Sequence, residues 1–191
     1  MWNPELAGGR RTRWALRAAV AAAALAVPLV VAPGSSAAEG PAVVQIQDRC
    51  DPATFVTPDG QHLCAPHAGE VVTLQTFLSR LPSGGDGHWR FHSDTITIEH
   101  PRALRAVTTG GEGHTFTEVS TFGKGILADV VAPFLNDAVA EKVDSVPVAG
   151  ADPFDVIGPL GDSRTLHLSP GVHKFQCEIH PWMRAVVTVE G

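Results

Sequence analysis

The chain lacks several features that would point to common classes of protein. Its 191 residues include only three cysteines and two methionines, and one of these methionines is Met1. No internal repeat and no G-x-S-x-G elbow occurs, so nothing supports a repeat protein or a serine hydrolase built on that elbow. The longest apolar run, residues 18–32, is interrupted by Pro28 and is shorter than the roughly 20 residues of a spanning helix.

The first 38 residues have the layout of a secretory signal peptide. Arginines come first, the apolar run follows, and small residues precede the expected cleavage site after Ala38. A retained membrane anchor is the alternative. Because Arg10 and Arg11 match a twin-arginine signal only loosely, the Sec and Tat routes both stay open. No cysteine stands at the cleavage point for lipid attachment, and we expect a secreted or periplasmic, extracytoplasmic protein.

The chain beyond residue 38 is short of positive charge. Residues 39–191 suit one domain with a sizeable core. They keep ten Lys and Arg residues against nineteen Asp and Glu residues, which gives a net charge of −9. An acidic surface of this kind argues against nucleic acid as a partner and favours solubility outside the cell.

Three cysteines are an odd number, so at least one thiol has no partner within the chain. Disulfides persist in oxidising compartments, and the turn-forming residues between Cys50 and Cys64 would let the chain fold back on itself. We therefore expect a Cys50–Cys64 disulfide, which leaves Cys177 free. A free thiol kept in such a compartment needs a reason, such as burial, a partner molecule or a metal ion.

The patterning predicts an all-β domain, residues 83–191, behind an N-terminal extension, residues 39–82. In the extension, residues 42–47 have strand character, and apolar residues from Leu74 to Leu81 recur at helical spacing behind Thr73 as N-cap. The domain is expected to be an antiparallel sandwich or barrel in which residues 123–162 form an extended loop with one short helix. Its expected strands include 89–91, 95–98, 104–107, 165–168, 173–177 and 185–189.

Three soft donors lie between the last two expected strands. Cys177, His180 and Met183 fall within seven residues, and they would meet at one end of the sandwich if both strands belong to one sheet. Pro181 stiffens the connection between them. A thiolate, an imidazole and a thioether, completed by one further histidine, form the donor set typical of blue-copper electron-transfer sites.

His114 is the candidate for the second histidine. It follows the glycine-rich turn 110–113 and begins an expected strand, about sixty residues before Cys177. Gly113 would let the backbone approach a metal closely, so that its carbonyl could lie opposite Met183.

The motifs G-H-T-F, at 113–116, and F-x-C-x-x-H-P-W-M, at 175–183, together resemble the cupredoxin family, the plastocyanin, amicyanin and azurin group. The short ligand loop is most similar to that of amicyanin. The resemblance extends from near residue 89 to residue 191 and implies an all-β Greek-key sandwich. It also implies one type 1 copper ion, held by His114, Cys177 and His180 with Met183 as the axial ligand.

A protein that resembles this family is expected to carry single electrons by Cu(I)/Cu(II) cycling, and not to be an enzyme, so no catalytic residue is assigned. We expect a monomer that exchanges electrons with a redox partner protein. The outer edge of His180 would serve as the exit for electrons, beside Trp182 in an exposed apolar patch. Thr115 stands where many relatives have an asparagine that ties the two ligand loops together, which leaves that bond open.

Other metals and functions are alternatives. The same ligands could serve copper storage, delivery or sensing without redox turnover. Zinc competes as the metal, although a thioether is a poor ligand for it. His88 and His92 would face the same side of a strand and could form a second metal site. No H-x-H pair and no second cysteine in the ligand loop is present for the additional coppers of multicopper or dinuclear centres. The other histidines are expected to be structural or solvated: His62, His67, His100, His167 and His173.

Overall fold

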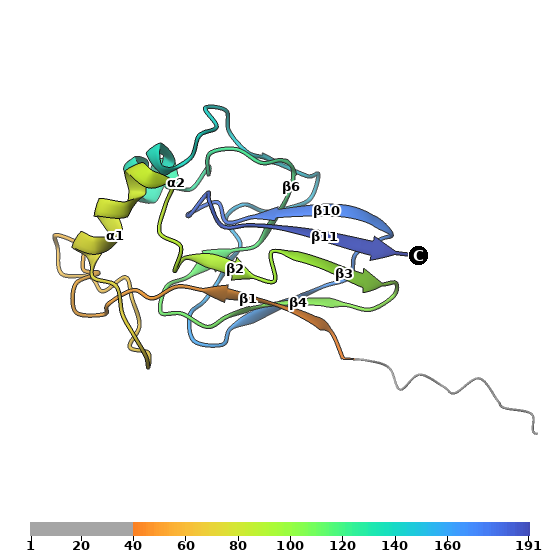
Figure 1. Cartoon of the computed structure of the whole chain (residues 1–191), viewed down its shortest axis with the longest axis horizontal. Coiled ribbons are helices and arrows are strands. Elements are labelled where there is room, and N and C mark those ends of the chain that lie inside the picture. The colour runs from red at the N-terminus through yellow and green to blue at the C-terminus, as the bar shows by residue number, and fades with distance from the viewer. Residues whose placement is uncertain (1–39) are drawn as a thin grey trace, which may run out of the picture. The chain divides into compact units, whose positions relative to one another are not determined.

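The computed structural model describes residues 40–191, and the expected signal peptide lies outside the described residues. The described part contains two larger β-sheets (Figure 1). The first has the strand order β2-β1-β4-β9 and the second the order β3-β11-β10-β6-β7, while β5 pairs with β8 alone. The first sheet comprises β2 (Arg90–His92), β1 (Ala42–Gln47), β4 (Leu104–Thr108) and β9 (Ser163–Leu166). The second comprises β3 (Thr95–Glu99), β11 (Arg184–Glu190), β10 (Gly171–Gln176), β6 (Thr117–Thr121) and β7 (Val146–Pro147). The separate pair comprises β5 (His114–Thr115) and β8 (Val156–Ile157).

The expected all-β sandwich is confirmed, but the expectation of strictly antiparallel sheets is wrong. β1 runs parallel to β4, and β11 runs parallel to β3, while the remaining pairs are antiparallel. Both parallel pairs join strands that are far apart in the chain. Parallel neighbours require a long connection that returns the chain to the same end of the sheet, and the intervening segments provide it.

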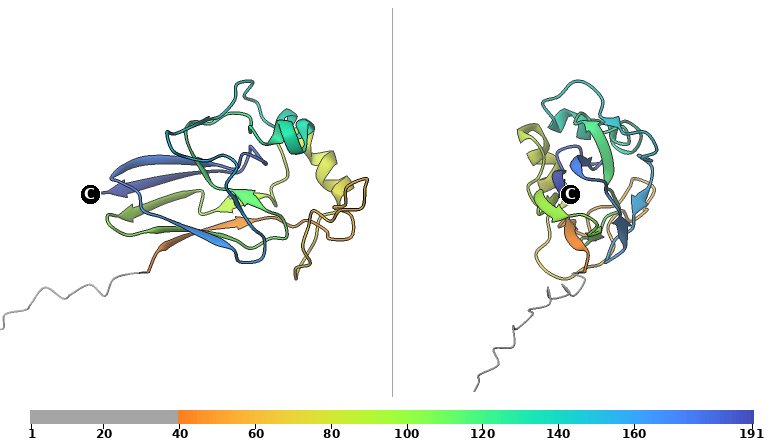
Figure 2. Two further views of the ribbon diagram at one scale, coloured as in Figure 1. Left: turned by 180° about the vertical axis from the view of Figure 1, so that it is seen from behind. Right: turned by 90° about the vertical axis from the view of Figure 1, so that its right-hand side faces the viewer.

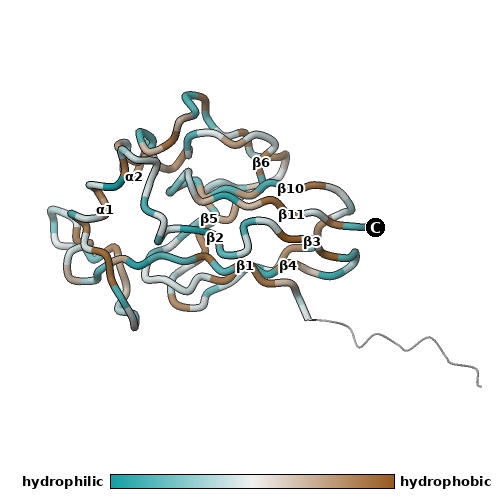
Figure 3. Tube along the Cα trace, in the orientation of Figure 1, coloured by the Kyte–Doolittle hydropathy of each residue, from teal (hydrophilic) through white to brown (hydrophobic). Residues whose placement is uncertain are grey.

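Aromatic rings fill the space between the two sheets. Phe91 in β2 lies edge-on to Phe116, with ring centroids 5.0 Å apart, and Phe116 stacks on Phe175 in β10 at 4.2 Å. Alternation along β11 buries Ala185, Val187 and Val189 on one face. Figure 3 shows the hydrophobic stretches in β3 and β11. This core holds β10 and β11 in register, and so fixes the ends of the turn between them.

The segment between β1 and β2 folds onto one end of the sandwich. β1 itself is a strand of the first sheet, so the segment that lies outside the sheets comprises residues 48–89, which are the rest of the extension up to residue 82 and the seven residues after it. They contain helix α1 (Leu74–Arg80) and the 3-10 helix η1 (Leu81–Ser83). As expected, Thr73 caps α1, because its hydroxyl accepts a hydrogen bond from the Thr76 amide. The division of the chain at residue 83 stays a prediction.

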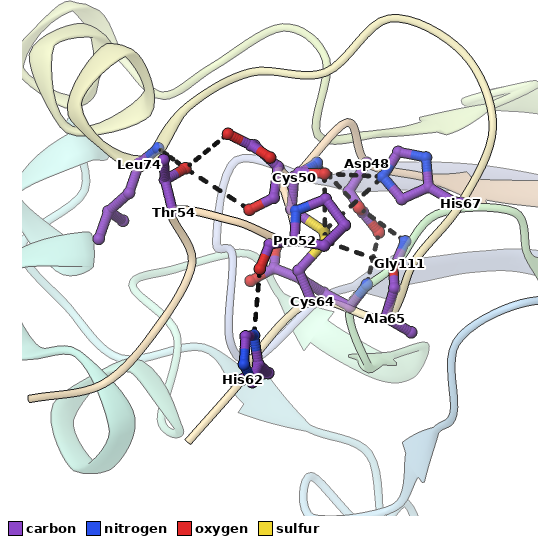
Figure 4. Close-up of a disulfide and its surroundings, with 12 residues drawn as sticks. Asp48, Cys50, Pro52, Thr54, His62, Cys64, Ala65, His67, Leu74 and Gly111 are labelled. Atoms are coloured by element: carbon purple, nitrogen blue, oxygen red, sulfur yellow. Dashed lines mark hydrogen bonds between the residues drawn. A yellow bond between two sulfur atoms is a disulfide. The ribbon is translucent and has the colours of Figure 1, made fainter. Parts of the chain in front are cut away.

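The Cys50–Cys64 disulfide is confirmed and closes the first part of this segment (Figure 4). Cys177 is free and buried. Residues 123–162 contain helix α2 (Ala128–Val131), the 3-10 helix η2 (Pro133–Ala138), β7 and β8, with irregular backbone between them. Views from behind and from the side place α1 and α2 together at the end of the sheets to which the β10–β11 turn also points (Figure 2). None of the helices within residues 40–191 is long and apolar enough to cross a membrane.

Candidate metal centre

The turn between β10 and β11 carries three of the four expected ligands. Cys177 directly follows β10, Met183 directly precedes β11, and His180 lies between them. Two backbone hydrogen bonds close the turn: the Cys177 amide donates to the Met183 carbonyl at 3.0 Å, and the Met183 amide donates to the His180 carbonyl at 2.9 Å. The turn is therefore a compact extension of the two strands.

The structure brings His114, Cys177 and His180 together. The Cys177 Sγ lies 3.8 Å from the Nδ1 of His114 and 3.8 Å from the Nδ1 of His180. These three atoms all lie within 4.8 Å of one another, so a single ion could contact all of them. His114 and Cys177 are completely buried, and His180 is 3% exposed. Met183 is also buried in the same turn, at 1% exposure.

The charges of the centre suit a cation. Burial raises the pKa of Cys177, but hydrogen bonds and charge interactions with His114 and His180 outweigh it and hold that pKa well below its ordinary range. Burial lowers the pKa of His114, but its contacts with Asp48 and Cys177 outweigh it, and the net shift is upward. Without a metal, the centre therefore favours a thiolate beside an imidazolium. A metal ion that binds there must displace the imidazolium proton.

Two carboxylates lie behind the two histidine rings. The Nε2 of His114 is 3.0 Å from the Oδ2 of Asp48, and the Nε2 of His180 is 3.8 Å from the Oε2 of Glu112. Burial raises the pKa of Glu112, and the Trp89 indole N–H donates a hydrogen bond to its carboxylate. Neither acid was among the expected site residues. Glu112 belongs to the same glycine-rich turn as His114 and could have been noticed, whereas nothing in the pattern around Asp48 relates it to His114.

Thr115 provides the link between the two ligand loops that the sequence left open. Its hydroxyl oxygen accepts a hydrogen bond of 2.8 Å from the buried amide of Glu178, the residue after Cys177. The Glu178 carboxylate in turn accepts hydrogen bonds from the Ile126 amide and the Ser145 hydroxyl. The bond between the two ligand loops is thus formed, with the threonine hydroxyl as its acceptor.

The expectation that the outer edge of His180 is exposed is wrong. Phe77 of α1 lies edge-on to the His180 ring with centroids 6.3 Å apart, and Trp182 lies edge-on to it at 5.6 Å. Trp182 is itself half-buried: it packs closely on Gly85, and its indole N–H donates to the Trp89 carbonyl at 3.2 Å. The resemblance implies that electrons leave through the outer edge of His180. In this structure, residues 48–89 cover that side of the centre.

The second metal site considered for His88 and His92 does not form. His88 instead contacts Asp86, at 2.7 Å, and neither histidine belongs to a cluster of three potential ligands among residues 40–191. His67 lies near Cys50 and Cys64, but their sulfur atoms are joined in the disulfide. His173 forms an ion pair with Glu118.

No protein-family model matches the chain, and no curated protein matches it significantly. Among solved structures, it is similar to an oxidised plastocyanin from Dryopteris crassirhizoma, with 17% identity, 78% of this chain and 100% of that chain covered, and a TM-score of 0.39. A purple cupredoxin from Nitrosopumilus maritimus shares 14% identity over 78% of this chain and 99% of its own, with a TM-score of 0.40. An amicyanin from Paracoccus versutus shares 18% over 53% and 73%, with a TM-score of 0.33. Likenesses this distant say nothing about the metal, and the assignment of the centre depends on its own geometry.

Proposed function

We propose that the protein is an exported type 1 copper protein of the cupredoxin kind that carries single electrons for a partner protein. The observation that carries this proposal is the position of the Cys177 sulfur, 3.8 Å from the Nδ1 atoms of both His114 and His180 in a fully buried site. One thiolate and two imidazoles, with the Met183 thioether in the same turn, form the soft donor set that copper prefers.

The residues around the donors would hold them in place through a change of oxidation state. Copper, when bound, supplies the one-electron chemistry. β10 and β11 hold the ends of the ligand turn, and Thr115 ties that turn to the strand that begins with His114. Asp48 holds the far side of the His114 ring. Ligands that move little between the two oxidation states keep electron transfer fast, which is the property a carrier needs.

The other features expected of the protein belong to the same proposal. It would be monomeric and extracytoplasmic, its ligand loop would be of the amicyanin type, and it would have no catalytic residue. Zinc is the competing metal. The presence of a buried thioether in the turn that also carries Cys177 and His180 favours copper over zinc, because structural zinc sites usually have four strong ligands.

Titration of the purified protein with Cu(II) tests the proposal. We expect an intense visible absorption from thiolate-to-copper charge transfer, and we expect Cys177→Ser to abolish it. His92→Ala is the matched control, because this exposed histidine on β2 lies outside the centre and its loss should leave the absorption unchanged. A wild-type protein that binds Cu(II) without colour, or that takes up only zinc, would overturn the proposal.

Copper storage, delivery or sensing is the second candidate, and the cover over His180 favours it. A ligand that is 3% exposed under Phe77 cannot itself contact a redox partner. Voltammetry of the copper-loaded protein separates the two functions. Fast and reversible electron exchange is expected of a carrier, whereas slow or irreversible exchange would favour the second function.

A further inference from the structure

Asp48 occupies a buried position between the extension and the candidate metal centre. It directly follows β1, and its side chain is completely shielded from solvent. Its Oδ1 accepts hydrogen bonds from the amides of Gly111, at 2.9 Å, and Cys50, at 3.3 Å. Figure 4 shows Asp48 beside the disulfide and Gly111. The carboxylate thus links the end of β1 to the turn that precedes His114.

The second oxygen of Asp48 holds the turn and the ring at once. Oδ2 accepts from the Glu112 amide at 3.1 Å and lies 3.0 Å from the Nε2 of His114. The backbone approaches so closely that a side chain at Gly110 would collide with the carboxylate. Four donors around one carboxylate define its position and, through it, the position of the imidazole.

This contact determines which nitrogen of His114 is available to a metal. An ionised carboxylate only accepts hydrogen bonds, so Nε2 must carry a proton. Nδ1 is then the nitrogen that a metal ion can bind once it displaces the second proton of the imidazolium, and it is the one that faces the Cys177 sulfur at 3.8 Å. Backbone amides donate to both oxygens of Asp48, so both oxygens act as acceptors, as in an ionised carboxylate.

Among the ion pairs of residues 40–191, the only cationic partner of Asp48 is the His114 ring. Asp86, which is equally buried, differs in this respect because the Arg80 guanidinium lies 2.7 Å from its carboxylate. An uncompensated negative charge behind a ligand makes that ligand a stronger electron donor. It also interacts more favourably with a doubly charged ion than with a singly charged one.

We propose that Asp48 is the positioning residue of His114 and that its charge stabilises the oxidised relative to the reduced ion at the centre. This inference depends on the proposed copper function. It assigns to the extension a part in setting the properties of the metal, in addition to covering His180.

The variant Asp48→Asn tests the charge, because asparagine has the same shape and retains an acceptor oxygen. We expect the ratio of Cu(II) to Cu(I) affinity to fall about tenfold, which is a rise of about 59 mV in the reduction potential for one electron. The matched control is Asp86→Asn, which removes a buried carboxylate that has its own guanidinium partner and does not touch a ligand. An Asp48→Asn protein with a normal blue absorption and an unchanged potential would overturn the proposal.

A second measurement applies if Asp48→Asn does not fold. Nitrogen and proton NMR of the wild-type protein loaded with Cu(I) or Zn(II) should find His114 bound to the metal through Nδ1, with a strongly deshielded proton on Nε2. Metal bound through Nε2 would contradict the positioning role. If the wild-type protein binds no metal, the copper function fails separately. The Nε2 proton of the metal-free protein then tests the contact with Asp48, and its rapid exchange with water would overturn the inference.

Discussion

The ring of Phe77 lies edge-on to the imidazole of His180, with the two ring centroids 6.3 Å apart. Phe77 belongs to α1 in the extension, whereas His180 belongs to the turn between β10 and β11. Phe77 also packs against Trp89 at 4.5 Å and Trp182 at 6.1 Å. Phe77 therefore joins the extension to a cluster of aromatic rings that covers a candidate ligand.

Replacing Phe77 with alanine should uncover His180. We expect Phe77→Ala to lower the free energy of unfolding by about 3 to 5 kcal/mol, because a buried aromatic side chain is lost. We also expect the copper-loaded variant to exchange electrons faster between its own molecules, because the ligand edge becomes accessible. Chemical denaturation measures the first effect, and NMR line broadening in mixtures of the two oxidation states measures the second.

Phe55→Ala is the matched control for this experiment. Phe55 is equally buried and packs against Phe77 and Trp89, but it makes no ring contact with His180 among the contacts described for residues 40–191. It should lose similar stability without the gain in exchange rate. Equal exchange rates in both variants and the wild type would mean that the cover does not limit electron transfer.

The bond between Thr115 and Glu178 should stabilise the ligand turn. Thr115→Val keeps the shape of the side chain but leaves the buried Glu178 amide without its acceptor, which costs about 1 to 3 kcal/mol. We expect lower stability and faster release of copper, measured by denaturation and by transfer of the metal to a chelator. Thr115→Ser retains the hydroxyl and should restore most of both properties. If the valine variant matches the wild type in stability and in the rate of copper release, the bond does not stabilise the ligand turn.

The ligand turn could be predicted because its determinants are close together in the chain. Cys177, His180 and Met183 lie between two strands of clear alternating character, and such a turn must lie at one end of a sheet. The strand pattern also gave the correct class of fold, and the turn-rich spacing predicted the Cys50–Cys64 bond. Local periodicity and short spacing carry this kind of information.

The surroundings of the centre could not be predicted because they depend on contacts between distant segments. Asp48 and His114 are 66 residues apart, and Phe77 and His180 are farther apart still. No periodic pattern relates such pairs, since their approach depends on how β1 pairs with β4 and how the extension folds back. For the same reason, the parallel pairing of β3 with β11 was missed.

The ion pair between His173 and Glu118 should make stability depend on pH. Burial lowers the pKa of His173, but hydrogen bonds with Glu118 and the Ser169 carbonyl raise it by a larger amount, so the net shift is upward. The contribution to stability is therefore complete below the unfolded pKa of about 6.5 and is lost as the pH rises through the higher folded value. For a partly exposed pair we expect an effect of order 1 kcal/mol.

Urea denaturation of the metal-free protein from about pH 5 to pH 9 measures this dependence. Stability also depends on pH through groups other than His173, so the informative quantity is the difference in unfolding free energy between the wild type and His173→Gln. That difference should shrink as the pH rises. A difference that is constant over the whole range would show that the proton on His173 does not stabilise the fold.

The Cys50–Cys64 disulfide should stabilise both the extension and the turn that carries His114. Its sulfur atoms pack against Gly111, and the Ala65 amide donates to the Gly111 carbonyl at 2.7 Å. A bond that joins residues 14 apart contributes about 3 kcal/mol in the loop-entropy description. We expect a Cys50→Ala, Cys64→Ala double variant to lose about this much unfolding free energy, and the amides around Gly111 to exchange faster with solvent. The reduced wild-type protein should match the double variant, because both lack the same bond. If the double variant is as stable as the oxidised protein, and the amides around Gly111 are equally protected in both, then the backbone contacts alone hold that turn.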